Sequence, residues 1–142
     1  MRVFFDDPQL MLNYPPKIIL AFGETISGNT EILTWLLKNG YGELAALSFA
    51  IRGSEDAFHW LMNNGYTHLA ALDSAIDNDP KAYLWLKEHD FPFFVIFADA
   101  CNGKKEALDF MVQKNLVGML RVTQKIRSFR DNQTYDYHKF HF

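Results

Sequence analysis

The stretch SGNTEILTWLLKNGY, residues 27–41, returns 25 positions later as RGSEDAFHWLMNNGY, residues 52–66. Further along the chain the same 25-residue spacing continues. We call equivalent positions of successive units a column, and there is an aromatic column, a leucine column and a turn column. These are Trp35, Trp60, Trp85 and Phe110; Leu36, Leu61, Leu86 and Met111; Gly40, Gly65, Asp90 and Asn115. So many columns in one register predict a repeat protein with 25-residue units.

Apolar spacing predicts that each unit is a pair of short helices. Leu44, Leu47 and Ile51 form one stripe of a first helix, and Trp60 with Leu61 continues the corresponding stripe of a second helix. From this stripe we expect Trp60 to be a core residue whose replacement by alanine costs about 3–5 kcal/mol.

Turn and cap residues separate the predicted helices. A column of residues that tolerate left-handed backbone follows each first helix: Gly28, Gly53, Asn78 and Gly103. Directly after it stand Asn29, Ser54 and Asp79, whose side-chain oxygens we expect to cap the second helix, with Pro80 at its first position.

The repeat resembles the ankyrin repeat. Over residues 27–41 its second-helix signature, GHxEIVKLLLxxGA, is matched without a gap by Gly28, Glu31-Ile32-Leu33, Trp35-Leu36-Leu37 and Gly40. An ankyrin repeat is about 33 residues long, so these shorter units lack the β-hairpin of about eight residues. The resemblance covers about residues 18–127. It implies an ankyrin-like helical stack without projecting hairpins, and a role in binding other proteins.

We therefore predict one all-α domain over residues 1–142, an α-solenoid of short antiparallel helix pairs. Residues 17–130 hold the repeats, residues 1–16 a degenerate N-terminal cap, and residues 131–142 a C-terminal capping tail. Altered end units are expected because an open stack of repeats must cover its exposed ends.

Length and composition favour a soluble cytoplasmic protein. The chain has 142 residues, 49% of them hydrophobic, a net charge of −3 and a single cysteine. No apolar run approaches the roughly 18 residues of a spanning helix. Asp6 and Asp7 interrupt the start of the chain where a signal peptide would need an apolar run. We expect a monomer that does not contact membranes.

No pattern in the sequence indicates an enzyme, a cofactor or a metal ion. Cys101 falls in an isoleucine column, which predicts a small buried apolar residue rather than a nucleophile. Two groups of oxygen or nitrogen ligands lack the partners of a metal site: His138 with His141, and Asp73 with Asp77 and Asp79. Three further histidines fall in variable columns where exposure is expected: His59, His68 and His89.

The polar, variable columns of the first helices predict a protein-binding ribbon, although an ordinary solvated surface would show the same pattern. The predicted binding residues are Ser48, Phe49, Arg52, Asp73, Ser74, Asp77, Asp99, Asn102, Gln124 and Arg127. Acidic residues in its middle would complement a partner with a basic centre, and Phe49 would be the apolar anchor.

The end of the chain suggests an alternative function. Residues 119–142 carry a net charge of +3 and several aromatic residues: Phe129, Tyr135, Tyr137, Phe140 and Phe142. Such a segment can stack on bases and contact phosphates, which predicts nucleic-acid binding. It can equally cover the last repeat, since Tyr135 continues the aromatic column.

Overall fold

The computed structural model describes residues 14–132, which form nine α-helices and no β-strand. The helices are α1 (Pro16–Ile26), α2 (Thr30–Lys38), α3 (Gly42–Ile51), α4 (Glu55–Asn63), α5 (Thr67–Ile76), α6 (Pro80–Glu88), α7 (Pro92–Cys101), α8 (Lys105–Gln113) and α9 (Val117–Asp131). The predicted all-helical, solenoid-like stack of helix pairs is confirmed. The two predicted caps lie outside the described residues, apart from residues 14–16 and 131–132.

The predicted turns occupy their places in each unit. Asn78, Asp90 and Asn115 have φ angles of 69°, 66° and 57°, in the left-handed region. Glycine fills the equivalent turns elsewhere: Gly28, Gly40, Gly53, Gly65 and Gly103. These residues end each helix with little strain because glycine, asparagine and aspartate tolerate positive φ.

The three predicted caps begin the second helices. Asn29 accepts a hydrogen bond from the Ile32 N–H at 3.1 Å, and Ser54 accepts one from the Ala57 N–H at 3.0 Å. Asp79 accepts one from the Lys81 N–H at 2.9 Å, with Pro80 at the first helical position. Each cap satisfies one backbone donor that a helix start leaves without an intrahelical partner.

The leucine column, not the tryptophan column, forms the core. Leu36, Leu61, Leu86 and Met111 are fully buried. Trp60 is 43% exposed and stacks on Tyr66 with ring centroids 5.9 Å apart. The expected core role of Trp60 is therefore wrong. Adjacent residues on a helix point about 100° apart, so Trp60 lies at the rim when Leu61 faces inward.

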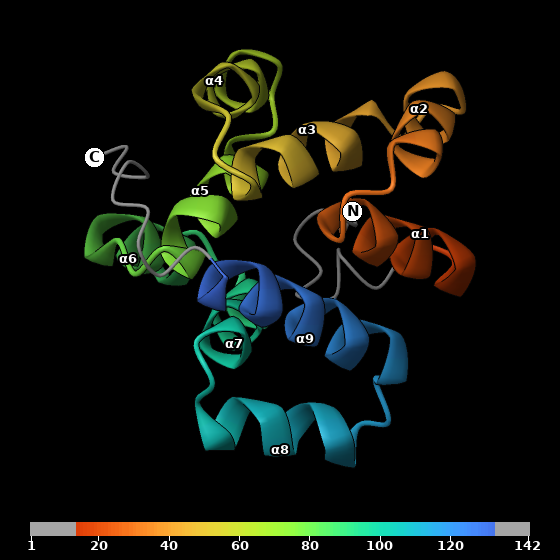
Figure 1. The fold of residues 1–142 in the computed structure, drawn as a ribbon. Helices are drawn as coiled ribbons and strands as arrows, with labels where there is room; N and C mark the ends of the chain where they lie inside the picture. The colour runs from red at the N-terminus through yellow and green to blue at the C-terminus, as the bar shows by residue number, and fades with distance from the viewer. Residues whose placement is uncertain (1–13, 133–142) are drawn as a thin grey trace, which may run out of the picture.

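The stack closes on itself. We call α1, α3, α5, α7 and α9 the inner helices, and α2, α4, α6 and α8 the outer helices. Each inner helix packs on the next, and α9 packs against α1 (Figure 1). The outer helices project around this ring. An open stack was expected, but here the last inner helix covers the first one.

Two glycines allow α9 to lie close to α1. A β-carbon at Gly23 would stand 3.3 Å from Lys125 Cδ and 3.4 Å from Val122 Cγ2, and one at Gly118 would stand 3.5 Å from Ile19 Cγ2. The starts of the two helices thus lie together. They run side by side in the same direction (Figure 1), as first helices of successive units do.

An aromatic stack joins α5 to α7. His68 lies 5.5 Å from Phe91 and 5.9 Å from Phe94, centroid to centroid, with nearly parallel rings. Its side chain is half-buried rather than exposed as expected, whereas His59 and His89 are exposed. Burial lowers the pKa of His68 from 6.5, and the charge of Glu43 opposes that shift.

This shift predicts an acid-sensitive stability. Below pH 6.5 the unfolded chain protonates His68 while the folded chain resists, so the free energy of unfolding falls until the lower folded-state pKa is reached. Urea unfolding between about pH 7 and pH 5 should show a smaller decrease for His68→Gln than for the wild type. The exposed-site control His59→Gln should keep the wild-type slope, and equal slopes in all three proteins would contradict the assignment.

Candidate functional site

The residues after inner helices α3 and α7 tie neighbouring units together at the carboxyl ends of these helices. Arg52, after α3, donates a hydrogen bond from its guanidinium to the Ile26 carbonyl at the end of α1, at 2.7 Å. Asn102, after α7, donates from its amide to the Ile76 carbonyl at the end of α5, at 3.1 Å. Both bonds satisfy terminal carbonyls that a helix leaves without intrahelical donors.

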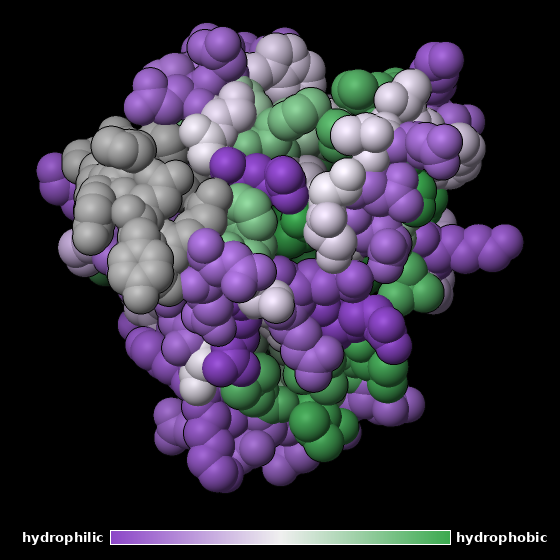
Figure 2. Space-filling view, viewed as in Figure 1, coloured by the Kyte–Doolittle hydropathy of each residue, from purple (hydrophilic) through white to green (hydrophobic). Residues whose placement is uncertain are grey.

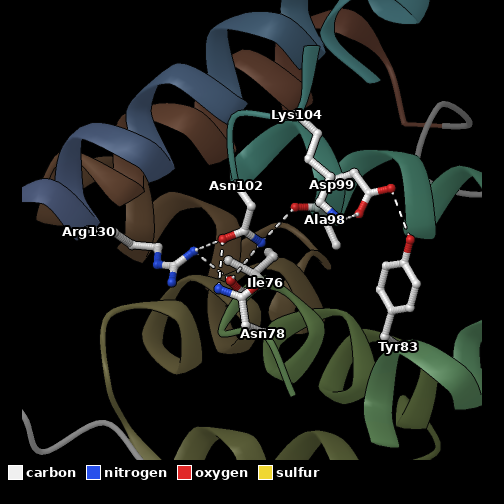
Figure 3. Close-up of polar contacts among 8 residues, drawn as sticks. All are labelled: Ile76, Asn78, Tyr83, Ala98, Asp99, Asn102, Lys104 and Arg130. Atoms are coloured by element: carbon white, nitrogen blue, oxygen red, sulfur yellow. Dashed lines mark hydrogen bonds and ion pairs between the residues drawn. The ribbon is translucent and has the colours of Figure 1, made fainter. Parts of the chain in front are cut away.

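Arg130 of α9 joins the second of these links (Figure 3). Its guanidinium donates to the Ile76 carbonyl at 2.5 Å and to Asn102 Oδ1 at 2.9 Å. Asn78 Nδ2 donates to the same Asn102 oxygen at 3.1 Å, and Arg130 Nε lies 3.9 Å from an Asp77 carboxylate oxygen. The end of α9 is thus held across α5 and α7 by a side chain that sequence reasoning treated only as part of a basic segment.

A groove of about 570 Å³ opens where α9 runs past the end of α1. We call it the basic groove, and its lining is Ile26, Ser27, Arg52, Arg121, Gln124, Lys125, Ser128, Phe129 and Asn132. The α9 residues among these recur every three or four positions, so they share one helix face. The surface along α9 is largely hydrophilic (Figure 2).

Two of the three cations in the basic groove are held in place. The Arg52 guanidinium carbon lies 5.0 Å from the centre of the Phe129 ring, in addition to its bond to α1. Lys125 Nζ lies 3.1 Å from a Glu24 carboxylate oxygen and donates to Ser27 Oγ at 3.1 Å. Arg121 is exposed. With no carboxylate in its lining, the groove is suited to an anion.

The structure divides the ten predicted binding residues into three sets. Exposed are Phe49, Arg52, Gln124 and Arg127; partly buried are Asp77, Asp99 and Asn102; buried are Ser48, Asp73 and Ser74. Of these, only Arg52 and Gln124 line the basic groove. The expected continuous ribbon is therefore interrupted, because three of its positions face the core of the ring.

The acidic centre of the predicted ribbon is not presented to solvent. Asp73 is fully buried. Asp99 accepts a hydrogen bond from the Tyr83 hydroxyl at 3.0 Å and lies 3.4 Å from Lys104 Nζ (Figure 3). Since Asp73 is buried and the Asp99 carboxylate is already paired, the expectation of a partner with a basic centre loses its support.

Sequence reasoning missed Arg121, Lys125 and Ser128 as a group with Arg52. The groove exists only because α9 packs on α1, about a hundred residues away along the chain. No local sequence pattern indicates that long-range contact. The one hint was the basic charge of residues 119–142. The tail aromatic residues that suggested nucleic-acid binding, and the two tail histidines that lacked the partners of a metal site, lie outside the described residues: Tyr135, Tyr137, His138, Phe140, His141 and Phe142.

Within residues 14–132, no three His, Cys, Asp or Glu side chains come together as a possible metal site. Cys101 is buried, as predicted, and burial raises the pKa of its thiol far above the ordinary value. Across the same residues, no helix combines the length and apolar character needed to cross a membrane.

No protein family model, curated protein or solved structure matches this chain. The structure establishes an all-helical, repeat-like fold of nine helices in the described residues.

Proposed function

We propose that this protein is a non-enzymatic protein–protein interaction module that binds a cytoplasmic partner at the carboxyl ends of its inner helices. The observation that carries the proposal is the exposure of Phe49, Arg52, Gln124 and Arg127, four variable residues of first-helix columns, beside an open groove. Constant apolar columns build the core of a repeat stack, so variable exposed columns are available for recognition. The resemblance to ankyrin repeats, whose first helices contribute to partner binding, supports the same face by analogy.

The exposed side chains indicate the chemistry of the partner. Phe49 is 41% exposed and offers an apolar anchor one helical turn from Arg52. The exposed charged residues of the ribbon are arginines, whereas its acidic residues are partly or fully buried. A partner with an acidic segment next to an apolar side chain therefore complements this face.

Affinity capture with the full chain tests the proposal. Wild type and the control variant Leu37→Ala, which truncates an exposed apolar residue on outer helix α2, should retain one protein from a lysate of the source organism in near-stoichiometric amount. Phe49→Ala should lose it, because a truncated anchor residue typically costs more than about 1 kcal/mol of binding. Capture that is equal for Phe49→Ala and wild type would contradict the proposed face.

Nucleic-acid binding is a second candidate, favoured by the Phe129 ring and the three cations that share the lining of the basic groove, with Arg52 placed over that ring. Fluorescence anisotropy with a labelled single-stranded oligonucleotide decides between the two. Binding through phosphates predicts an affinity that falls steeply as salt concentration rises. Retention of an oligonucleotide at low salt, together with no captured protein, would establish this candidate in place of the first.

A further inference from the structure

We propose that the basic groove binds the phosphate of a phosphorylated serine or threonine in the partner protein. The proposal rests on the protein-interaction function above and specifies what the partner presents. It is carried by the juxtaposition of Arg52, Arg121 and Lys125 around one groove at the α1–α9 contact.

Charge balance favours a phosphate over a carboxylate. The lining contributes three cations and no anion, and the nearby Glu24 offsets one cation through its ion pair with Lys125. About two positive charges remain. A phosphoserine or phosphothreonine carries roughly −1.5 to −2 charges at neutral pH and matches them. An aspartate or glutamate side chain supplies only one negative charge.

Two of the three cationic donors are arranged before any ligand binds. Arg52 is fixed by the Ile26 carbonyl and the Phe129 ring, and Lys125 is fixed by Glu24 and Ser27. Holding long basic side chains in one geometry removes part of the entropy cost of binding. Hydroxyl and amide groups in the same lining supply further hydrogen bonds to phosphate oxygens: Ser27, Gln124, Ser128 and Asn132.

The size of the groove points to a phosphate attached to a chain rather than a phosphate ion. Its volume of about 570 Å³ falls in the range of sites that hold ligands much larger than one ion. Among the described residues the groove is partly open to solvent, so a segment of protein can reach it. Phe49, exposed one turn from Arg52, would then contact a residue that flanks the phosphorylated one.

The full chain allows a test with a matched control. Arg121 of α9 and Lys38 of α2 are both exposed cations, but only Arg121 lines the groove. Arg121→Gln and Lys38→Gln therefore change the net charge equally and differ in position. Binding would be measured by fluorescence polarisation with a peptide library that has one fixed phosphoserine between degenerate positions. The unphosphorylated library and inorganic phosphate serve as the comparison probes.

We expect the phosphorylated library to bind and the unphosphorylated one to bind at least about tenfold more weakly. Arg121→Gln should weaken binding of the phosphorylated library by about tenfold or more, and Lys38→Gln by no more than about threefold. Circular dichroism would establish that both variants are folded. Equal losses in the two variants would show a general charge attraction and overturn the proposal. Binding of inorganic phosphate as tight as that of the library would also overturn it, because the ligand would then be a free ion.

The same variants separate this proposal from the broader one. If Arg121→Gln still captures the wild-type partner from lysate while Phe49→Ala does not, the interaction function stands and the phosphate site is wrong. If neither library binds and no protein is captured, both proposals fail.

Discussion

Leu61→Ala should lower the free energy of unfolding by about 2–5 kcal/mol. Leu61 belongs to the fully buried leucine column, at the point where outer helix α4 meets the inner ring. Removing its side chain leaves a cavity, because close-packed neighbours relax only partly. The measurement is urea unfolding followed by far-ultraviolet circular dichroism, which reports helix content directly.

The neighbouring residue provides the control. Trp60→Ala removes a larger side chain, yet we expect a loss of only about 1 kcal/mol, because the indole is nearly half exposed and its main contact is the stacked Tyr66 ring. A larger loss for Trp60→Ala than for Leu61→Ala would mean that the tryptophan column, after all, forms the core.

Gly23→Leu should open the contact between α1 and α9. A β-carbon at this buried position already meets Lys125 and Val122 at 3.3–3.4 Å, and a leucine side chain needs further space between the two helices. Overpacking of this kind costs about 1–3 kcal/mol, and occasionally more. We expect a lower melting temperature, together with faster hydrogen exchange along α9 than in the wild type.

Gly42→Leu is the matched control for this substitution. Gly42 begins α3, and a β-carbon there would meet nothing within 4 Å. The same chemical change should therefore leave hydrogen exchange in α9 at the wild-type rate. Fast exchange in α9 for both variants, or for neither, would show that the close approach at Gly23 does not hold the ring together.

The repeat period predicted the helices and their boundaries well, because these features depend on short-range interactions. Asn29 and Ser54 cap their helices by accepting hydrogen bonds from residues three positions away. Asn78 adopts a positive φ angle that depends only on its own residue type. Ring closure was not predictable in this way. It depends on the contact between Gly23 and α9, which lie about a hundred residues apart in the sequence. A glycine inside a helix does not indicate which distant helix packs against it.

The candidate site was predicted only in part. The 25-residue repeat period shows which positions vary between units, but it does not show which of these positions face solvent. Phe49 and Ser48 are adjacent in sequence, yet one is exposed and the other is buried. Asp73 looked like surface because aspartate is seldom fully buried. The grouping of Arg52 with Arg121 required the three-dimensional position of α9.

The closed ring also bears on how such a protein can evolve. Open arrays of repeats lengthen or shorten by duplication and deletion of whole units, because each unit contacts only its neighbours. Within residues 14–132, α1 meets both α3 and α9, so the five inner helices described there complete the circle. A sixth inner helix would have to separate α9 from α1. A ring with only four inner helices would leave a gap between the first and the last of them. The number of units is therefore fixed by geometry, and variation is left to the outer helices and exposed loops.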